Sequence, residues 1–158
     1  MTQEDKQLLL KDLCARLPYG VIAQACGWDD GEETEVIVPV RVYSINTDGY
    51  VYFGVNEYNV DYCPIEDCTP YLRPISSMTD EEIIELYKAF GFYYLTTNYE
   101  ITNEWISFKN AINNNKLFLP YPIWGDDVEN GIKWLNRKMF DYRGLIPKGL
   151  ALEAPENI

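Results

Sequence analysis

The chain has 158 residues, with 25 acidic and 13 basic side chains and a formal net charge of −12 at neutral pH. Because phosphate backbones attract clustered Lys and Arg, this charge disfavours nucleic-acid binding, and it suits either a basic protein partner or simply a soluble surface. A hydrophobic content of 47% excludes a disordered chain, and the length suits one domain that buries its core without disulfides or a metal ion.

The start of the chain is acidic and amphipathic, and no apolar run approaches the ~20 residues of a membrane helix. We therefore expect no signal peptide, no membrane span and a cytoplasmic location.

The chain contains no histidine, and its cysteines are Cys14, Cys26, Cys63 and Cys68. No two of them have CxxC spacing, so we expect buried, reduced thiols and no metal site. Without histidine, a Ser/His or Cys/His nucleophile pair is excluded, and general acid–base work would fall to carboxylates, Lys, Tyr or Cys. No glycine-rich phosphate loop is present. These absences disfavour an enzyme and indicate no cofactor.

In chain order, residues 3–17 predict a first helix. Thr2 and Asp5 have the spacing of a capping box, leucines recur at helical spacing, and Pro18 ends the helix.

Short runs that favour β-structure follow at 21–26, 35–43, 50–53 and 68–74. The Asn-Thr-Asp-Gly tetrapeptide at 46–49 is a strong turn signal, so the second and third runs form a hairpin. Four or five such strands suggest a small antiparallel sheet, which could close as an SH3-like barrel.

Residues 56–67 are polar and rich in turn formers, and we expect a loop there. Thr79 and Glu82 form a second capping-box pattern at the start of a helix that runs to about residue 90. Residues 103–113 predict a further helix.

The last quarter of the chain predicts a helix over 126–139, with apolar residues on one face and Asp126 and Asp127 where an N-cap belongs. A turn over 141–144 follows, and an apolar tail over 145–152 closes the core.

These elements predict an α+β fold, in which four or five short strands pack with about three helices. The expected organisation is a single domain over 1–158. Its sheet-rich part covers about 19–75, and its helical part covers 76–158 together with the N-terminal helix 3–17.

Three segments together resemble a family of small uncharacterised proteins from gut Bacteroidales and their phages or prophages. They are CARLPYG at 14–20, PYLRPISSMT at 70–79, and WLN, FDYRGLI and GLALEAP at 134–136, 140–146 and 149–155. The resemblance implies a bacterial cytosolic protein from a mobile-element setting, without an established activity. Members of that family often carry two histidines where this chain has Arg137, Lys138 and Met139, which speaks against an imidazole-dependent enzyme here.

Within these segments, Asp141, Tyr142 and Arg143 form the sharpest polar cluster. Arg143 could offer its planar fork to an anion or a partner carboxylate, or the cluster could brace the turn. Arg16 and Arg73 stand beside prolines and aromatic residues, and we hypothesise that all three arginines lie close together, in a network with Asp141 or Glu153.

A second candidate surface is aromatic. Tyr50 and Tyr52 alternate along one strand and therefore share a face, near Tyr58 and Tyr62 in the sequence. Such a strip could stack bases or bind a proline-rich peptide, or it could pack in the core. The candidate binding residues are thus Tyr71, Arg73, Asp141, Tyr142, Arg143, Tyr50 and Tyr52.

The favoured function is protein–protein binding by a phage-related protein, for example in anti-defence or host takeover. Two alternatives stay open. One is a nucleic-acid-binding accessory that uses Lys133, Arg137, Lys138, Arg143 and Lys148. The other is an enzyme that works with carboxylates or with a metal held by carboxylate oxygens.

Overall fold

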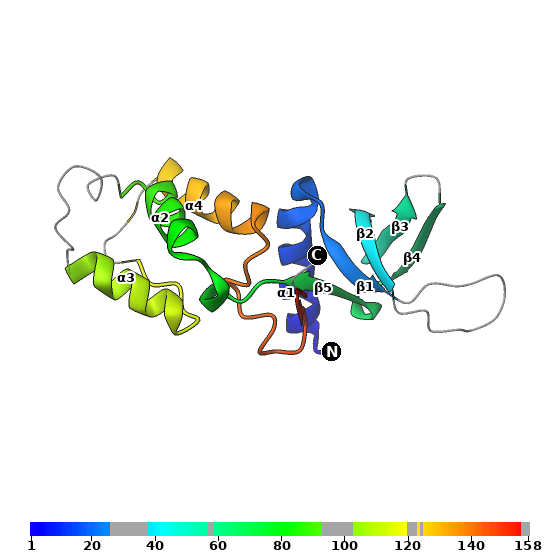
Figure 1. Ribbon diagram of the computed structural model, residues 1–158. Coiled ribbons are helices and arrows are strands. Elements are labelled where there is room, and N and C mark those ends of the chain that lie inside the picture. Colours follow the sequence, from blue (N-terminus) through cyan, green and yellow to red (C-terminus); the bar gives the residue numbers. More distant parts are fainter. Residues whose placement is uncertain (26–37, 57–58, 93–102, 120–122, 124, 156–158) are drawn as a thin grey trace. The chain divides into compact units, whose positions relative to one another are not determined.

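The protein has the α+β fold that its sequence predicts (Figure 1). A computed structural model describes residues 1–25, 38–56, 59–92, 103–119, 123 and 125–155. The chain divides into two compact units, of which one comprises residues 1–72 with 143–158 and the other comprises residues 73–142. The expectation of a single domain stays a prediction.

The first unit is built on a six-stranded sheet with the order β4-β3-β2-β1-β5-β6. The strands are β1 (Ile22–Ala25), β2 (Val38–Ile45), β3 (Tyr50–Asn56), β4 (Asn59–Pro64), β5 (Cys68–Leu72) and β6 (Leu152–Glu153). The first five pair in antiparallel fashion, whereas β5 and β6 are parallel, so the sheet is mixed. The described strands form an open sheet, not a closed barrel.

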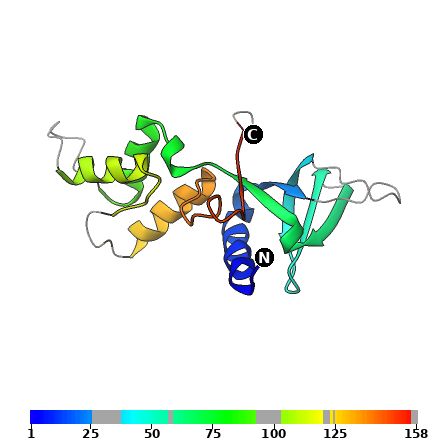
Figure 2. The same ribbon diagram turned by 90° about the horizontal axis from the view of Figure 1, so that it is seen from below.

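The predicted hairpin is confirmed, since β2 pairs with β3 across the turn (Figure 1, Figure 2). Gly49 adopts a φ of 83°, a left-handed conformation that only glycine adopts without strain, and its N–H donates to the carbonyl of Asn46 at 3.2 Å. The Asn46 side chain also accepts from the backbone N–H groups of Asp48 and Tyr50.

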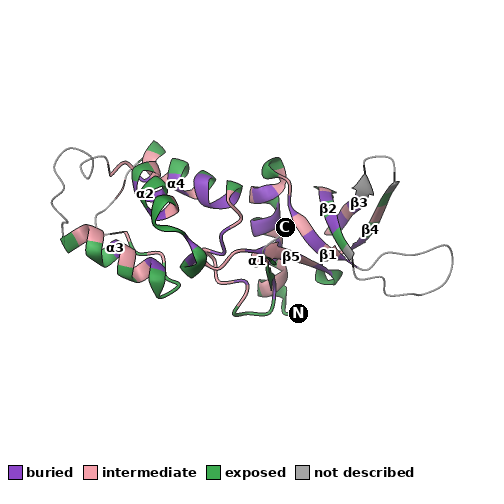
Figure 3. Ribbon diagram, viewed as in Figure 1, coloured by how far each residue is buried: buried purple, intermediate pink, exposed green. Residues whose placement is uncertain are grey.

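Helix α1 (Gln3–Arg16) begins as the sequence predicts, with a complete capping box between Thr2 and Asp5. Its buried residues lie at helical spacing (Figure 3), and they include Leu9 and Leu13. The sheet contributes Val51 and Phe53 to the buried apolar residues of this unit. These positions alternate with outward-facing ones, which fixes the direction of the tyrosines described below.

Two strands were not expected. β4 lies inside the predicted loop 56–67, where Val60 and Tyr62 face outward and Cys63 is buried. The alternation is short and broken by Asn, Asp and Pro, so only pairing with β3 makes it a strand. β6 has two residues and depends on parallel pairing with Tyr71 and Leu72.

The cysteines differ in exposure. Cys63 and Cys68 are buried as expected, but Cys14 is exposed on α1, and Cys26 lies outside the described residues. Burial raises the pKa of the Cys68 thiol to about 12, with a smaller contribution from nearby Cys63, so Cys68 is not a reactive thiolate.

The second unit is helical and comprises α2 (Asp80–Ala89), α3 (Asn103–Asn113) and α4 (Asp126–Arg137). The predicted capping box of Thr79 and Glu82 is present. The helices share one apolar core, to which Leu86, Phe108 and Leu135 contribute fully buried side chains.

Helix α4 departs from its prediction at both ends. Its N-cap is Gly125, and no side chain caps it, so the aspartates at 126 and 127 lie in the first turn. There their charges favour the helix N-terminus without capping it. The helix stops at Arg137, because Met139 takes a left-handed φ of 58° and the Phe140 N–H donates to the Leu135 carbonyl at 3.0 Å.

Candidate functional site

Three tyrosine rings meet on the outward face of β3 and β4. We call Tyr50, Tyr52 and Tyr62 the tyrosine strip. The Tyr62 ring centroid lies 5.8 Å from that of Tyr50 and 5.8 Å from that of Tyr52. Tyr62 is 55% exposed and Tyr50 is 39% exposed. Large aromatic surface thus remains accessible on this face.

The strand register explains this arrangement. Tyr52 pairs with Tyr62 and Tyr50 pairs with Pro64, so side chains from both strands share one face. The alternate residues Val51 and Phe53 are buried. The predicted grouping of Tyr50, Tyr52 and Tyr62 is therefore correct in space, whereas Tyr58 lies outside the described residues.

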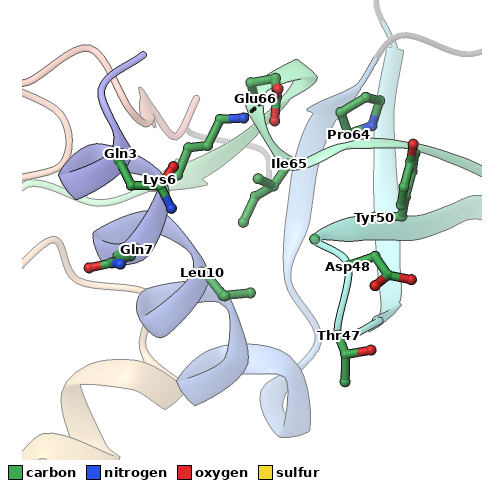
Figure 4. A pocket seen from close by; sticks show the side chains of 11 residues that line it. Gln3, Lys6, Gln7, Leu10, Thr47, Asp48, Tyr50, Pro64, Ile65 and Glu66 are labelled. Atoms are coloured by element: carbon green, nitrogen blue, oxygen red, sulfur yellow. Dashed lines mark hydrogen bonds and ion pairs between the residues drawn. The ribbon is translucent and has the colours of Figure 1, made fainter.

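A pocket of about 430 Å³ adjoins the strip (Figure 4). We call it the α1 pocket. Side chains of α1, including Lys6 and Leu10, line one side, and the turn after β2 lines another with Asp48. Tyr50 and Pro64 line the pocket as well, and Tyr50 also belongs to the strip. The pocket and the strip thus share a wall.

The pocket carries both signs of charge. The Lys6 ammonium lies 2.6 Å from a carboxylate oxygen of Glu66 (Figure 4), and this hydrogen bond holds the pKa of Glu66 below its usual range. Both side chains are partly exposed, so the pair exchanges readily with solvent and contributes little to stability. No ion pair of Asp48 occurs among the residues that the structure describes.

β4 stands at one end of the order of described strands, so its outer backbone groups could in principle pair with another strand. The Tyr62 N–H, however, donates to the side-chain carboxylate of Asp61 at 2.8 Å. That donor is already bound, which weakens β4 as a site for strand addition. The accessible feature is the face of the strand.

Two of the three arginines of the predicted network share one carboxylate. In the first unit, Arg16 and Asp12 are both completely buried and make two hydrogen bonds, of 2.7 and 3.0 Å. Arg143 donates to the same Asp12 carboxylate at 3.2 Å. Asp12 therefore joins these two arginines, and the predicted part of Asp141 or Glu153 in the network stays a prediction. Nothing in the sequence singles out Asp12 except its i, i+4 spacing to Arg16.

Arg73 belongs to the second unit and binds Glu82. Its guanidinium makes two parallel hydrogen bonds to that carboxylate, of 2.8 and 2.9 Å, and lies 4.3 Å from the ring centroid of Phe140. The hydrogen bonds from Arg73 hold the pKa of Glu82 below its usual range. Glu82 also completes the cap of α2, so Arg73 braces a helix start.

The other residues predicted to bind a partner, such as Tyr71, Asp141 and Tyr142, are partly or fully buried. Tyr71 is half-buried on β5 and pairs with Leu152. Asp141 is buried, and its N–H donates to the carbonyl of Arg73 at 2.8 Å. Tyr142 packs against the helical core. Tyr71 and Arg143 lie in the first unit, whereas the other three lie in the second, so these residues form no single site within one unit.

The basic side chains around α4 are engaged in part. Lys133 pairs with Glu129 at 2.7 Å, and Lys138 lies 3.9 Å from Glu85 and 5.6 Å from the ring centroid of Trp134. Arg143 binds Asp12 as described. Three of the five predicted basic residues thus have acidic partners, Lys133 and Lys138 in the second unit and Arg143 in the first.

The sequence did not indicate the α1 pocket. Lys6 and Glu66 are 60 positions apart, and no local pattern links a helix face to a short turn after β4. Among the described residues, no group of three or more His, Cys, Asp or Glu side chains is arranged to hold a metal ion. Across the same residues, no helix combines the length and apolar character needed to cross a bilayer.

Comparisons with protein-family models, with curated proteins and with solved structures find no match to this chain.

Proposed function

We propose that this protein is a binding module that holds an extended, proline-containing segment of a partner protein on the tyrosine strip. The carrying observation is the ring cluster of Tyr50, Tyr52 and Tyr62, in which Tyr50 and Tyr62 are exposed and Tyr52 is half-buried. SH3-like domains use aromatic strips of this kind for proline-rich segments, which are already ordered as polyproline II helices and so lose little entropy on binding.

The chemistry of tyrosine supports this choice. Tyrosine offers a large, rigid surface for apolar contact and a hydroxyl for hydrogen bonds, at low entropic cost. Val60 is also exposed on this face and extends its apolar area. A prolyl ring packs well on such a surface, because both groups are rigid and present apolar atoms.

The overall charge supports a basic segment. With a net charge of −12, the protein attracts cationic partners over long range and repels nucleic acid. The tyrosine rings could stack nucleobases, but the accompanying phosphates would meet this negative field. A basic, proline-containing segment fits both the strip and the charge.

The resemblance to phage-related proteins suggests where such a segment comes from. We propose a host or phage protein in the bacterial cytoplasm as the partner, with anti-defence or host takeover as the biological role.

A titration tests the proposal. Fluorescent peptides from a library of proline-containing sequences with Lys or Arg would be titrated with the whole protein at low salt. Tyr62→Ala is expected to weaken binding of the selected peptides roughly tenfold, as for an exposed aromatic hot spot. Phe118→Ala removes another exposed ring, which is 50% accessible and lies in the second unit, and is expected to leave affinity unchanged. Failure of the wild type to bind any peptide, or equal losses in both variants, would refute the proposal.

A further inference from the structure

We infer that the α1 pocket takes the guanidinium group of an arginine in the bound segment, with Asp48 as its carboxylate partner. This inference rests on the proposed function and adds the side chain that the site selects. Three observations support it: the pocket lies beside the tyrosine strip, Asp48 and Glu66 line it, and Glu66 already pairs with Lys6.

The α1 pocket adjoins the tyrosine strip. Tyr50 lines the pocket and contacts Tyr62 of the strip, so a segment lying on the strip passes the mouth of the pocket. A volume of about 430 Å³ falls in the range of small-ligand sites and accepts a long side chain. A side chain that leaves the segment near Tyr50 can therefore enter.

The lining of the α1 pocket contains carboxylates. Asp48 and Glu66 line the pocket, and Glu66 already holds an ammonium group, that of Lys6, at 2.6 Å (Figure 4). The pocket thus binds a cation from its own chain. Asp48 has no ion pair among the described residues and belongs to the lining of the same pocket, so it is the carboxylate left for an incoming cation.

The aromatic residue in the pocket lining favours a guanidinium over an ammonium group. Tyr50 belongs to the pocket lining, and a planar guanidinium can stack on an aromatic ring while it donates to a carboxylate. An ammonium group is compact and strongly hydrated, and it gains less from this wall. Arginine is therefore preferred over lysine.

Lys6 has the opposite effect. Its ammonium occupies Glu66 and adds positive charge to the pocket, so it competes with the incoming arginine. Removing Lys6 should strengthen arginine binding, whereas removing the charge of Asp48 should weaken it. Opposite changes from two pocket residues would be hard to obtain from general destabilisation.

The experiment compares two peptides on the whole protein. One is a polyproline peptide with a single arginine near its end, and the other carries citrulline, which is neutral and nearly the same shape, in its place. We expect the wild type to bind the arginine peptide roughly tenfold more tightly, from one partly exposed ion pair and one cation–π contact. Asp48→Asn should remove this preference, and Lys6→Ala should increase it.

Asp67→Asn is the matched control. Asp67 lies beside Glu66 in the same short 3₁₀ helix (Ile65–Asp67) and is exposed, but it does not line the pocket. Its variant loses the same charge as Asp48→Asn and should keep the preference for arginine. If Asp67→Asn lowers the preference as much as Asp48→Asn does, long-range charge explains it and the pocket assignment is wrong.

The outcomes separate this inference from the proposed function. Equal binding of both peptides, still dependent on Tyr62, would refute the arginine pocket and leave the peptide module standing. If neither peptide binds, the proposed function fails, and arginine methyl ester is then titrated into isotope-labelled protein. Shifts of the amide signals of Asp48, Gly49 and Glu66 would support the pocket as an arginine site, and their absence would overturn it.

Discussion

Arginines in the shared sequence segments bind carboxylates of their own unit. Arg16 and Arg143 meet at Asp12, and Arg73 binds Glu82. A buried guanidinium requires a paired carboxylate, because an isolated buried charge loses its hydration without compensation. The three segments therefore have a structural explanation in these contacts, and the tyrosine strip lies outside them.

The first prediction concerns Asp12, which is fully buried between two arginines. Asp12→Asn removes the negative charge that accepts two hydrogen bonds from the buried Arg16 guanidinium. We expect a loss of about 3–5 kcal/mol in the free energy of unfolding, the typical cost of breaking a buried ion pair. Urea unfolding followed by circular dichroism measures it.

Glu129→Gln is the control for this prediction, because it breaks the exposed pair with Lys133 on α4. Exposed pairs of this kind contribute little, so no measurable change is expected. An Asp12→Asn protein as stable as this control would show that Asp12 does not neutralise Arg16.

At the level of helices and strands, local sequence patterns predict where helices start. They predict poorly those strands that form only because they pair with a neighbour. The capping boxes at Thr2 and Thr79 were correct because all their atoms lie within a few residues. β4 was missed because its six residues, with Asn, Asp and Pro among them, have weak β-propensity and form a strand through the ladder with β3. The parallel pairing of β6 with β5 joins residues that are 81 positions apart in the sequence, such as Tyr71 and Leu152.

The candidate site, too, could be predicted from the sequence only where its arrangement is local. Tyr50 and Tyr52 could be placed on one face from alternation alone. Their contact with Tyr62 depends on the register of β4, and the pocket depends on α1 lying beside the turn after β2. These arrangements join residues far apart in the chain, and no local pattern in a single sequence predicts them.

The second prediction concerns the contact between α2 and α4. A Cβ atom on Gly131 would lie 2.1 Å from the nearest ring atom of Phe90, which is almost completely buried. Although alanine favours helices, Gly131→Ala forces the ring and the helices apart. We expect a loss of about 1–3 kcal/mol in unfolding free energy, as for an overpacked core.

Asn130→Ala makes a matched control, since Asn130 is the exposed neighbour on the same helix. It should keep or slightly raise stability through helix propensity. The double variant Gly131→Ala with Phe90→Leu should recover part of the loss, because the smaller side chain makes room. A single Gly131→Ala variant as stable as Asn130→Ala would contradict the close packing.

At the scale of the whole molecule, the two compact units differ in how the chain builds them. The core of the helical unit consists of buried residues that all fall between positions 75 and 140. The sheet unit takes residues from both ends of the chain, since Arg143 binds Asp12 and the Ala154 N–H donates to the Leu72 carbonyl at 2.8 Å. Continuous and divided units should respond differently to cutting the chain.

The last prediction follows from this difference. A fragment of residues 73–142 keeps every buried residue of its core and should unfold cooperatively on its own in urea. A fragment of residues 1–72 lacks Arg143 and the buried Leu145 and Leu150, so it should show a weak or non-cooperative transition. Joining residues 143–158 to it through a flexible glycine–serine linker should restore cooperativity, because the Asp12 pairing and the strand pairing of β6 return. The joined chain with Arg143→Ala tests the ion pair within this effect. If residues 1–72 alone unfold as sharply as the joined chain, the C-terminal segment is an attachment to a complete fold and not part of its core.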